Sequence, residues 1–129
     1  MAVVTKYGFT ETALLMTGGT ATAWASMALG TGSAADATTL SALATELTNS
    51  GLERVAAATV TVAASDATND TCKFVHTWTA SASKNVKECG VFNSSAAGDM
   101  LCYGTFTSAI PMESDDTLKV TWSVTVKAG

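Results

Sequence analysis

Alternation of apolar and polar residues at every second position is the feature that most constrains the fold of this 129-residue chain. It is clearest near the C-terminus, where the stretch 118–127 reads LKVTWSVTVK. Its apolar members are Leu118, Val120, Trp122, Val124 and Val126. Because successive side chains of a strand point to opposite faces, this period of two predicts a β-strand with one buried and one wet side.

Other stretches carry the same pattern. In AATVTVAA, Val60 and Val62 share one face, and in CKFVHTWTA the residues Phe74, His76 and Trp78 do so. WASMALG, residues 24–30, is a further strand candidate, and ECGVFNSSAAGDMLCYGTF, residues 88–106, is predicted to be a hairpin with an exposed tip. The joints at 64–70 and 94–99 contain the Asn, Asp, Ser and Gly residues that turns favour. We therefore expect a mainly β protein with a single antiparallel β-sandwich or barrel-like domain.

Helical signals are short and lie on the N-terminal side. FTETALLMTGG predicts a short helix capped by Thr10 and stopped at Gly18 or Gly19. In ATTLSALATELT, leucines at spacings of three and four predict two or three further turns, with Leu40, Leu43 and Leu47 as the apolar stripe. These patterns divide the chain into an N-terminal arm with a short helix, residues 1–23, and an antiparallel β domain, residues 24–129.

Charge and hydropathy exclude several partners. The chain has 7 basic and 11 acidic residues without a basic cluster, so nucleic acid is not an expected partner. No apolar run approaches the roughly 20 residues that span a bilayer, so we expect no membrane partner. No secretory signal is evident either, so we expect the protein to be synthesised in a cytoplasm. In that reducing compartment Cys72, Cys89 and Cys102 should be thiols.

Reactive constellations are weak. The three cysteines and His76 lack the close pair of ligands typical of a zinc knuckle, and we expect small side chains packed on strands instead. Any triad must use His76, the only histidine, which is aligned with Phe74 and Trp78 and has no GxSxG partner motif. We interpret the glycines of ALGTGSAAD and the acids Asp115 and Asp116 as turn residues. No catalytic residue, metal or cofactor is expected.

The order of several motifs resembles a family of small structural proteins of tailed bacteriophages. It comprises an ALGTG turn, a segment that ends at Glu46, an arginine before the next strand, an E-x-G-L-F-N strand in which Val91 replaces the Leu here, a Met-Leu pair and a DTLKVTW final strand. The matching positions are Ala28 to Gly32, Leu43, Glu46, Arg54, Glu88, Gly90 to Asn93, Met100, Leu101 and Asp116 to Trp122. The first 23 residues match none of these motifs.

This resemblance implies a non-enzymatic virion protein assembled in the host cytoplasm. The leading hypothesis is a capsid decoration, or cement, protein that binds the major capsid protein on the outer capsid surface, self-associated as a homotrimer. We expect the N-terminal segment to make the contact and to be removable without unfolding the domain; its partner-binding residues are Ala2, Val3, Val4, Thr5, Lys6, Tyr7 and Phe9.

Two alternatives stay open. One is a structural protein of the tail tip, baseplate or fibre attachment region. The other is a carbohydrate-binding module that stacks sugars on Trp24, Trp78 or Trp122, although two of these tryptophans lie on the apolar faces of predicted strands.

Overall fold

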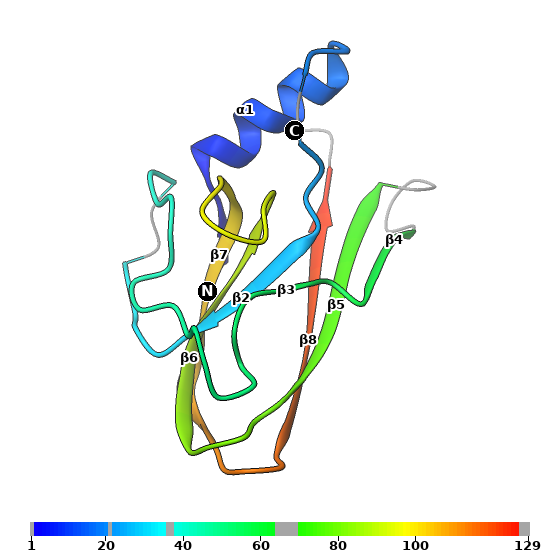
Figure 1. The fold of residues 1–129 in the computed structure, drawn as a ribbon. Helices are drawn as coiled ribbons and strands as arrows, with labels where there is room; N and C mark the ends of the chain where they lie inside the picture. Colours follow the sequence, from blue (N-terminus) through cyan, green and yellow to red (C-terminus); the bar gives the residue numbers. More distant parts are fainter. Residues whose placement is uncertain (1, 21, 36–37, 64–69, 127–129) are drawn as a thin grey trace.

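Two antiparallel sheets packed face to face form the protein, as a computed structural model shows (Figure 1). The structure describes residues 2–20, 22–35, 38–63 and 70–126. The first sheet contains, in spatial order, β1 (Ala2–Val4), β7 (Met100–Met112), β6 (Lys84–Phe92), β2 (Ser26–Gly30) and β3 (Val55–Ala56). The second contains β4 (Thr59–Ala63), β5 (Thr71–Thr79) and β8 (Thr117–Thr125). The predicted mainly β sandwich is confirmed.

The hairpin predicted over residues 88–106 is confirmed as β6 and β7, joined through residues 93–99. Cys89 and Cys102 of this hairpin are buried, whereas Cys72 on β5 is exposed, contrary to the expectation that all three thiols pack inside. Cys72 is the second residue of β5, next to the strand end where Thr71 pairs with Thr125.

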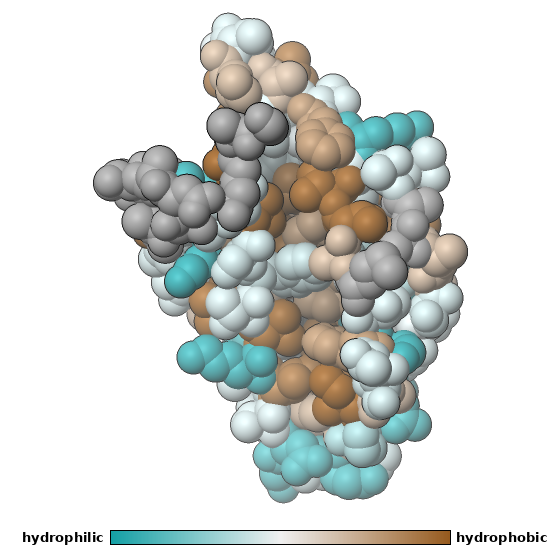
Figure 2. Space-filling view, turned by 180° about the vertical axis from the view of Figure 1, so that it is seen from behind, coloured by the Kyte–Doolittle hydropathy of each residue, from teal (hydrophilic) through white to brown (hydrophobic). Residues whose placement is uncertain are grey.

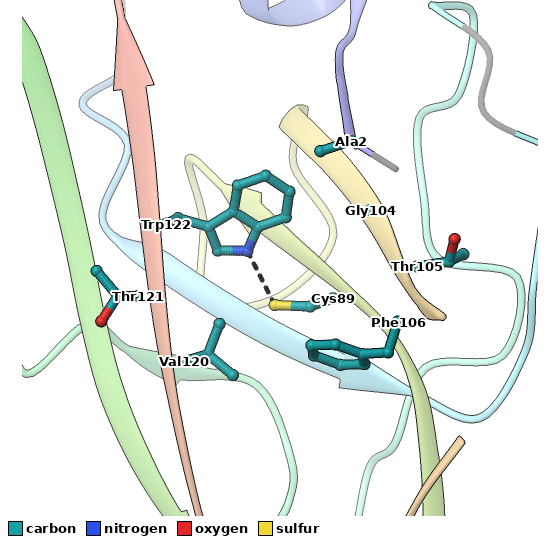
Figure 3. A pocket seen from close by; sticks show the side chains of 8 residues that line it. All are labelled: Ala2, Cys89, Gly104, Thr105, Phe106, Val120, Thr121 and Trp122. Atoms are coloured by element: carbon teal, nitrogen blue, oxygen red, sulfur yellow. Dashed lines mark hydrogen bonds between the residues drawn. The ribbon is translucent and has the colours of Figure 1, made fainter. Parts of the chain in front are cut away.

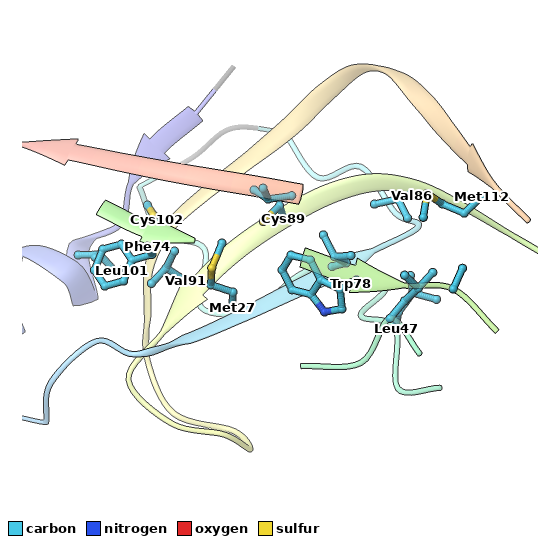
Figure 4. Close-up of a cluster of buried hydrophobic side chains, with 14 of the residues drawn as sticks. Met27, Leu47, Phe74, Trp78, Val86, Cys89, Val91, Leu101, Cys102 and Met112 are labelled. Carbon is cyan, nitrogen blue, oxygen red and sulfur yellow. The ribbon is translucent and has the colours of Figure 1, made fainter. Parts of the chain in front are cut away.

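The main core fills the space between the sheets. Met27 and Leu29 of β2, Phe74 and Trp78 of β5, and Val91 of β6 lie in this space, as Figure 4 shows for most of them. Trp78, only 1% exposed, donates its indole N–H to the Glu53 carbonyl at 3.0 Å. The apolar face predicted for β5 is therefore the core face, and the ring of His76 packs edge-on against Trp78 with centroids 4.7 Å apart.

One helix, α1 (Lys6–Met16), follows β1 directly. The predicted cap at Thr10 is wrong: Thr5 is the cap, because its hydroxyl accepts from the Gly8 amide and its own amide donates to the Leu101 carbonyl of β7. Gly8 allows the close approach of helix and sheet, since a methyl group there would lie 2.6 Å from that same carbonyl oxygen. The predicted stop is confirmed, with Gly18 at φ 71°.

The second predicted helix is wrong. In the described part of residues 31–49 no helix forms, and the chain crosses the outer face of the five-stranded sheet instead. Its backbone is bonded like a strand, with Leu47 N–H donating to the Leu29 carbonyl and Thr31 N–H to the Thr45 carbonyl, both at 2.9 Å. These tertiary bonds replace the helical ones, and the frequent threonines weaken helix propensity. Leu43 and Leu47 accordingly pack into two different clusters.

A buried carboxylate holds this crossing segment in place. Glu88 is fully buried and accepts from the amides of Ala44 and Thr45 at 3.1 and 2.8 Å and from the Tyr103 hydroxyl at 3.0 Å. Gly30 is required beside it, because a methyl group there would overlap the Glu88 carboxylate and lie 2.6 Å from the Thr45 carbonyl oxygen. The glycines of the ALGTG stretch are therefore structural, as predicted.

Strand β4 departs from the expected pattern of one buried face. Val60 and Val62 are 50% and 59% exposed. They are directly opposite Phe74 and Cys72 of β5, so they are on the inner side of their sheet. Because β4 is the terminal strand of that sheet, this part of the inner face extends beyond the cover of the opposing sheet.

Candidate functional site

A groove runs along one open side of the sandwich, between the edge formed by β1 and β7 and the free edge of β8. Three contiguous hollows of about 290, 200 and 440 Å³ make up this groove, which we call the seam groove. They are contiguous because Ala2 and Trp122 line the first two, and Val4 and Val124 line the last two. Figure 2 shows a hollowed band of apolar residues on this face.

The seam groove exists because the two sheets have different edge strands there. β1 has only three residues and pairs with Cys102 to Gly104 of β7, whereas β8 has nine residues and pairs only with β5. The two edges are therefore not joined to each other by a shared strand. Inner-face side chains of β8, namely Val120, Trp122 and Val124, form one wall of the groove.

One hydrogen bond crosses the floor of the groove. The indole N–H of Trp122 donates to the sulfur of Cys89 at 3.0 Å, with Phe106 and Val120 beside them (Figure 3). Burial raises the pKa of the Cys89 thiol to about 12, against a smaller opposing effect of the Trp122 bond. Burial also raises the pKa of the Cys102 thiol, and the neighbouring Cys89 adds to this effect. Both thiols are protonated and unreactive near neutral pH.

The lining is uncharged throughout. Among the described residues that line the three hollows there are apolar residues, threonines, one serine, one glycine and Cys89 and Cys102, but no lysine, arginine, aspartate or glutamate. At the end of the groove next to α1, the side chains of Phe9 and Val126 are 61% and 70% exposed. The groove is suited to bind an uncharged, apolar segment of a protein rather than to perform acid–base or phosphate chemistry.

The N-terminal residues predicted to bind a partner fall into three groups. Ala2, Val3, Val4 and Phe9 line the seam groove. Thr5 is buried as the helix cap, and Lys6 lies over the ring of Tyr7, 5.1 Å from its centroid. Their partner-binding role stays a prediction.

This segment is not an appendage of the described fold. β1 pairs with β7, and Thr5 donates from its amide and its hydroxyl to the carbonyls of Leu101 and Met100. The expectation that residues 2–9 can be removed without unfolding the domain stays a prediction, and the deletion would take away an edge strand and the helix cap.

Metal and sugar sites find little support in the geometry. In the part of the chain that the structure describes, no group of three or more His, Cys, Asp or Glu side chains is placed to hold a metal ion. Trp24 and Trp78 are 9% and 1% exposed, so neither offers a face for stacking, and Trp122 is half-buried in the groove wall. Within the same described residues, no helix is long and apolar enough to cross a membrane.

The charged residues that stand out in the sequence are used to hold loops. Arg54 donates from Nε and Nη2 to the two carboxylate oxygens of Glu46 at 2.8 and 2.6 Å, and from Nη1 to the carbonyls of Ser94 and Ala97. Its guanidinium also stacks 3.6 Å from the centre of the Phe92 ring. In the final turn, Asp116 accepts from the Glu113 amide at 2.8 Å, as expected for a turn acid.

Fold and groove together define a β-sandwich module with a long uncharged groove on one side. The chain belongs to the family described as Podophage GP4 fiber I protein gp80, whose sequence model matches residues 7–126. Comparison with curated proteins and with solved structures found no match. The protein is therefore a bacteriophage structural protein associated with the virion, as the resemblance in the motifs implied.

Proposed function

We propose that this chain is a non-enzymatic fibre component of a phage virion that attaches to a neighbouring protein chain of the virion through its seam groove. The observation that carries the proposal is the family match, which extends over both sheets and names a fibre protein. The uncharged groove supports it, because an apolar concavity flanked by strand edges suits recognition of a protein segment. Of the possible roles expected from the sequence, the fibre attachment region agrees best with that family.

Capsid decoration is the second candidate. The observation that favours it is the exposed β1 edge, where Ala2 and Val4 lie at the rim of the groove and offer a place for an added strand. In this version the partner is the major capsid protein, the location is the outer capsid surface and the protein is a homotrimer.

The copy number in purified particles tests both proposals. Quantitative mass spectrometry against the major capsid protein should find few copies per particle, and an antibody to this chain should label the tail region in electron micrographs. A ratio near one to one with label over the shell would instead establish decoration. Absence of the chain from the particle would contradict both candidates.

A further inference from the structure

Two complementary features lie at opposite ends of the three-stranded sheet. One end is β8, whose free edge borders the seam groove. The other end is β4, an uncharged strand of sequence TVTVA that exposes Val60 and Val62. Exposed apolar edge strands are templates for pairing with another chain. The same molecule thus carries both an apolar groove beside a strand edge and an apolar strand of matching character.

The side-chain rows of the sheet connect these two ends. Across the sheet, Val60 is in register with Phe74 and Phe74 with Trp122. In the next row, Val62 is in register with Cys72 and Cys72 with Val124. Both rows face the inner side, so a second β4 placed beside β8 would direct its two valines into the groove, next to Trp122 and Val124.

Direction and length also agree. β4 and β8 each run antiparallel to β5, so they run parallel to one another. A rotation about an axis along the strands keeps that direction and brings the β4 of one copy beside the β8 of the next. In this register the five residues of β4 match the stretch Thr121 to Thr125, which lines the groove.

We propose that the seam groove binds the β4 strand of a second copy of this chain, in a head-to-tail contact that joins the three-stranded sheets of neighbouring copies. Such heterologous contacts form a closed ring where the rotation closes and an open series where it does not. Three copies would be one closed form. The inference deepens the virion role proposed above, but it can fail separately, because a chain that is found in particles and stays monomeric keeps the role and loses the contact.

Paired substitutions on β4 test the contact. The test variant carries Val60→Lys and Val62→Lys, which place two charges on the inner face of β4. The matched control carries Thr59→Lys and Thr61→Lys, which add the same charge to the outer face of the same strand. Size-exclusion chromatography with light scattering should find an oligomer for the unmodified chain and the control, and a monomer for the valine variant. All four side chains are exposed, so circular dichroism should be unchanged.

A mixing experiment tests the head-to-tail geometry. Val124→Lys should damage the groove and leave β4 intact; Val126→Lys, at a 70% exposed residue, serves if the first variant fails to fold. Each variant alone should be a monomer. Mixed with the valine variant, it should form dimers only, since one intact groove then meets one intact β4. A monomeric unmodified chain, an oligomer that survives both lysines on the inner face, or a mixture that stays monomeric would each overturn the proposal.

Discussion

Trp122 on β8 and Cys89 on β6 connect the two sheets through an N–H···S hydrogen bond of 3.0 Å beneath the seam groove. Because β8 and the β1–β7 edge share no strand, this bond is a direct polar link between the sheets on the open side. It also fixes the orientation of the indole that forms the groove wall.

We expect Trp122→Phe to destabilise the protein by about 1 kcal/mol, since the aromatic ring remains but the donor to sulfur is lost. Urea unfolding should measure this, and the same substitution in a Cys89→Ala background is the control. There the sulfur is already absent, so the two changes should show a coupling of about 0.5 to 1.5 kcal/mol. Additive effects would show that the bond contributes nothing to stability.

The three thiols should differ in reactivity. Cys72 is exposed, whereas Cys89 and Cys102 are buried with raised pKa values. A thiol reagent at neutral pH should therefore modify one cysteine of the native protein quickly and the other two only after denaturation. Peptide mapping should assign the fast site to Cys72, and Cys72→Ser should abolish the fast phase. Rapid native labelling of Cys89 would show that the groove floor is open to solvent.

Stability should fall under alkaline conditions. Burial raises the pKa of Cys89 from 9.0 to about 12, so above about pH 9 the unfolded chain releases a thiol proton that the folded chain retains. The stabilisation that comes from this raised pKa is fully present below about pH 9 and is lost as the pH rises toward the pKa of the folded state. Over that range the free energy of unfolding should fall by up to about 1.4 kcal/mol per pH unit for each buried thiol. Urea unfolding between pH 8 and about 11 should reveal it. Cys89→Ala should give a shallower decline, and an equal slope in both proteins would contradict this origin.

Glu88 should be the most sensitive polar position in the described fold. Glu88→Gln retains the size but turns one acceptor toward the Ala44 and Thr45 amides into a donor, so we expect a loss of about 2 to 3 kcal/mol. Tyr103→Phe removes only the hydroxyl that joins Glu88 to the Ala34 amide and should cost about 1 to 2 kcal/mol. Thermal unfolding compares the two, and a Gln variant more stable than the Phe variant would contradict the assigned contacts.

Arg54 should not be replaceable by lysine. Its planar group contacts both oxygens of Glu46, two carbonyls of the 93–99 loop and the Phe92 ring at once, and an ammonium group cannot reproduce that geometry. Arg54→Lys should increase amide hydrogen exchange in the loop between β6 and β7. Lys119→Arg, which also replaces one basic residue by another but at an exposed position, is the control and should leave the exchange of the loop unchanged. If the loop amides of Arg54→Lys were as protected as those of the unmodified protein, Arg54 would not hold the loop.

Alternation predicted β5 and β8, because each has one face against the opposing sheet, whereas the hairpin of β6 and β7 was predicted from two apolar runs and the turn between them. Leucine spacing failed for residues 31–49, because it predicts a helix where Glu88, distant in sequence, accepts hydrogen bonds from the Ala44 and Thr45 amides. Alternation also failed for Val60 and Val62, because the pattern of a strand does not reveal whether the other sheet covers its inner face. The seam groove depends on which strands are the edges, and strand order is not encoded in any local pattern.

The uncharged lining of the seam groove has a consequence for the environment in which a particle can persist. Contacts made from apolar side chains and backbone groups, unlike ion pairs between exposed charges, are not weakened by dissolved salt. A joint formed on this surface should therefore hold equally in dilute fresh water and in brackish or nutrient-rich media, so that the ionic strength outside the host would not decide whether the particle stays assembled.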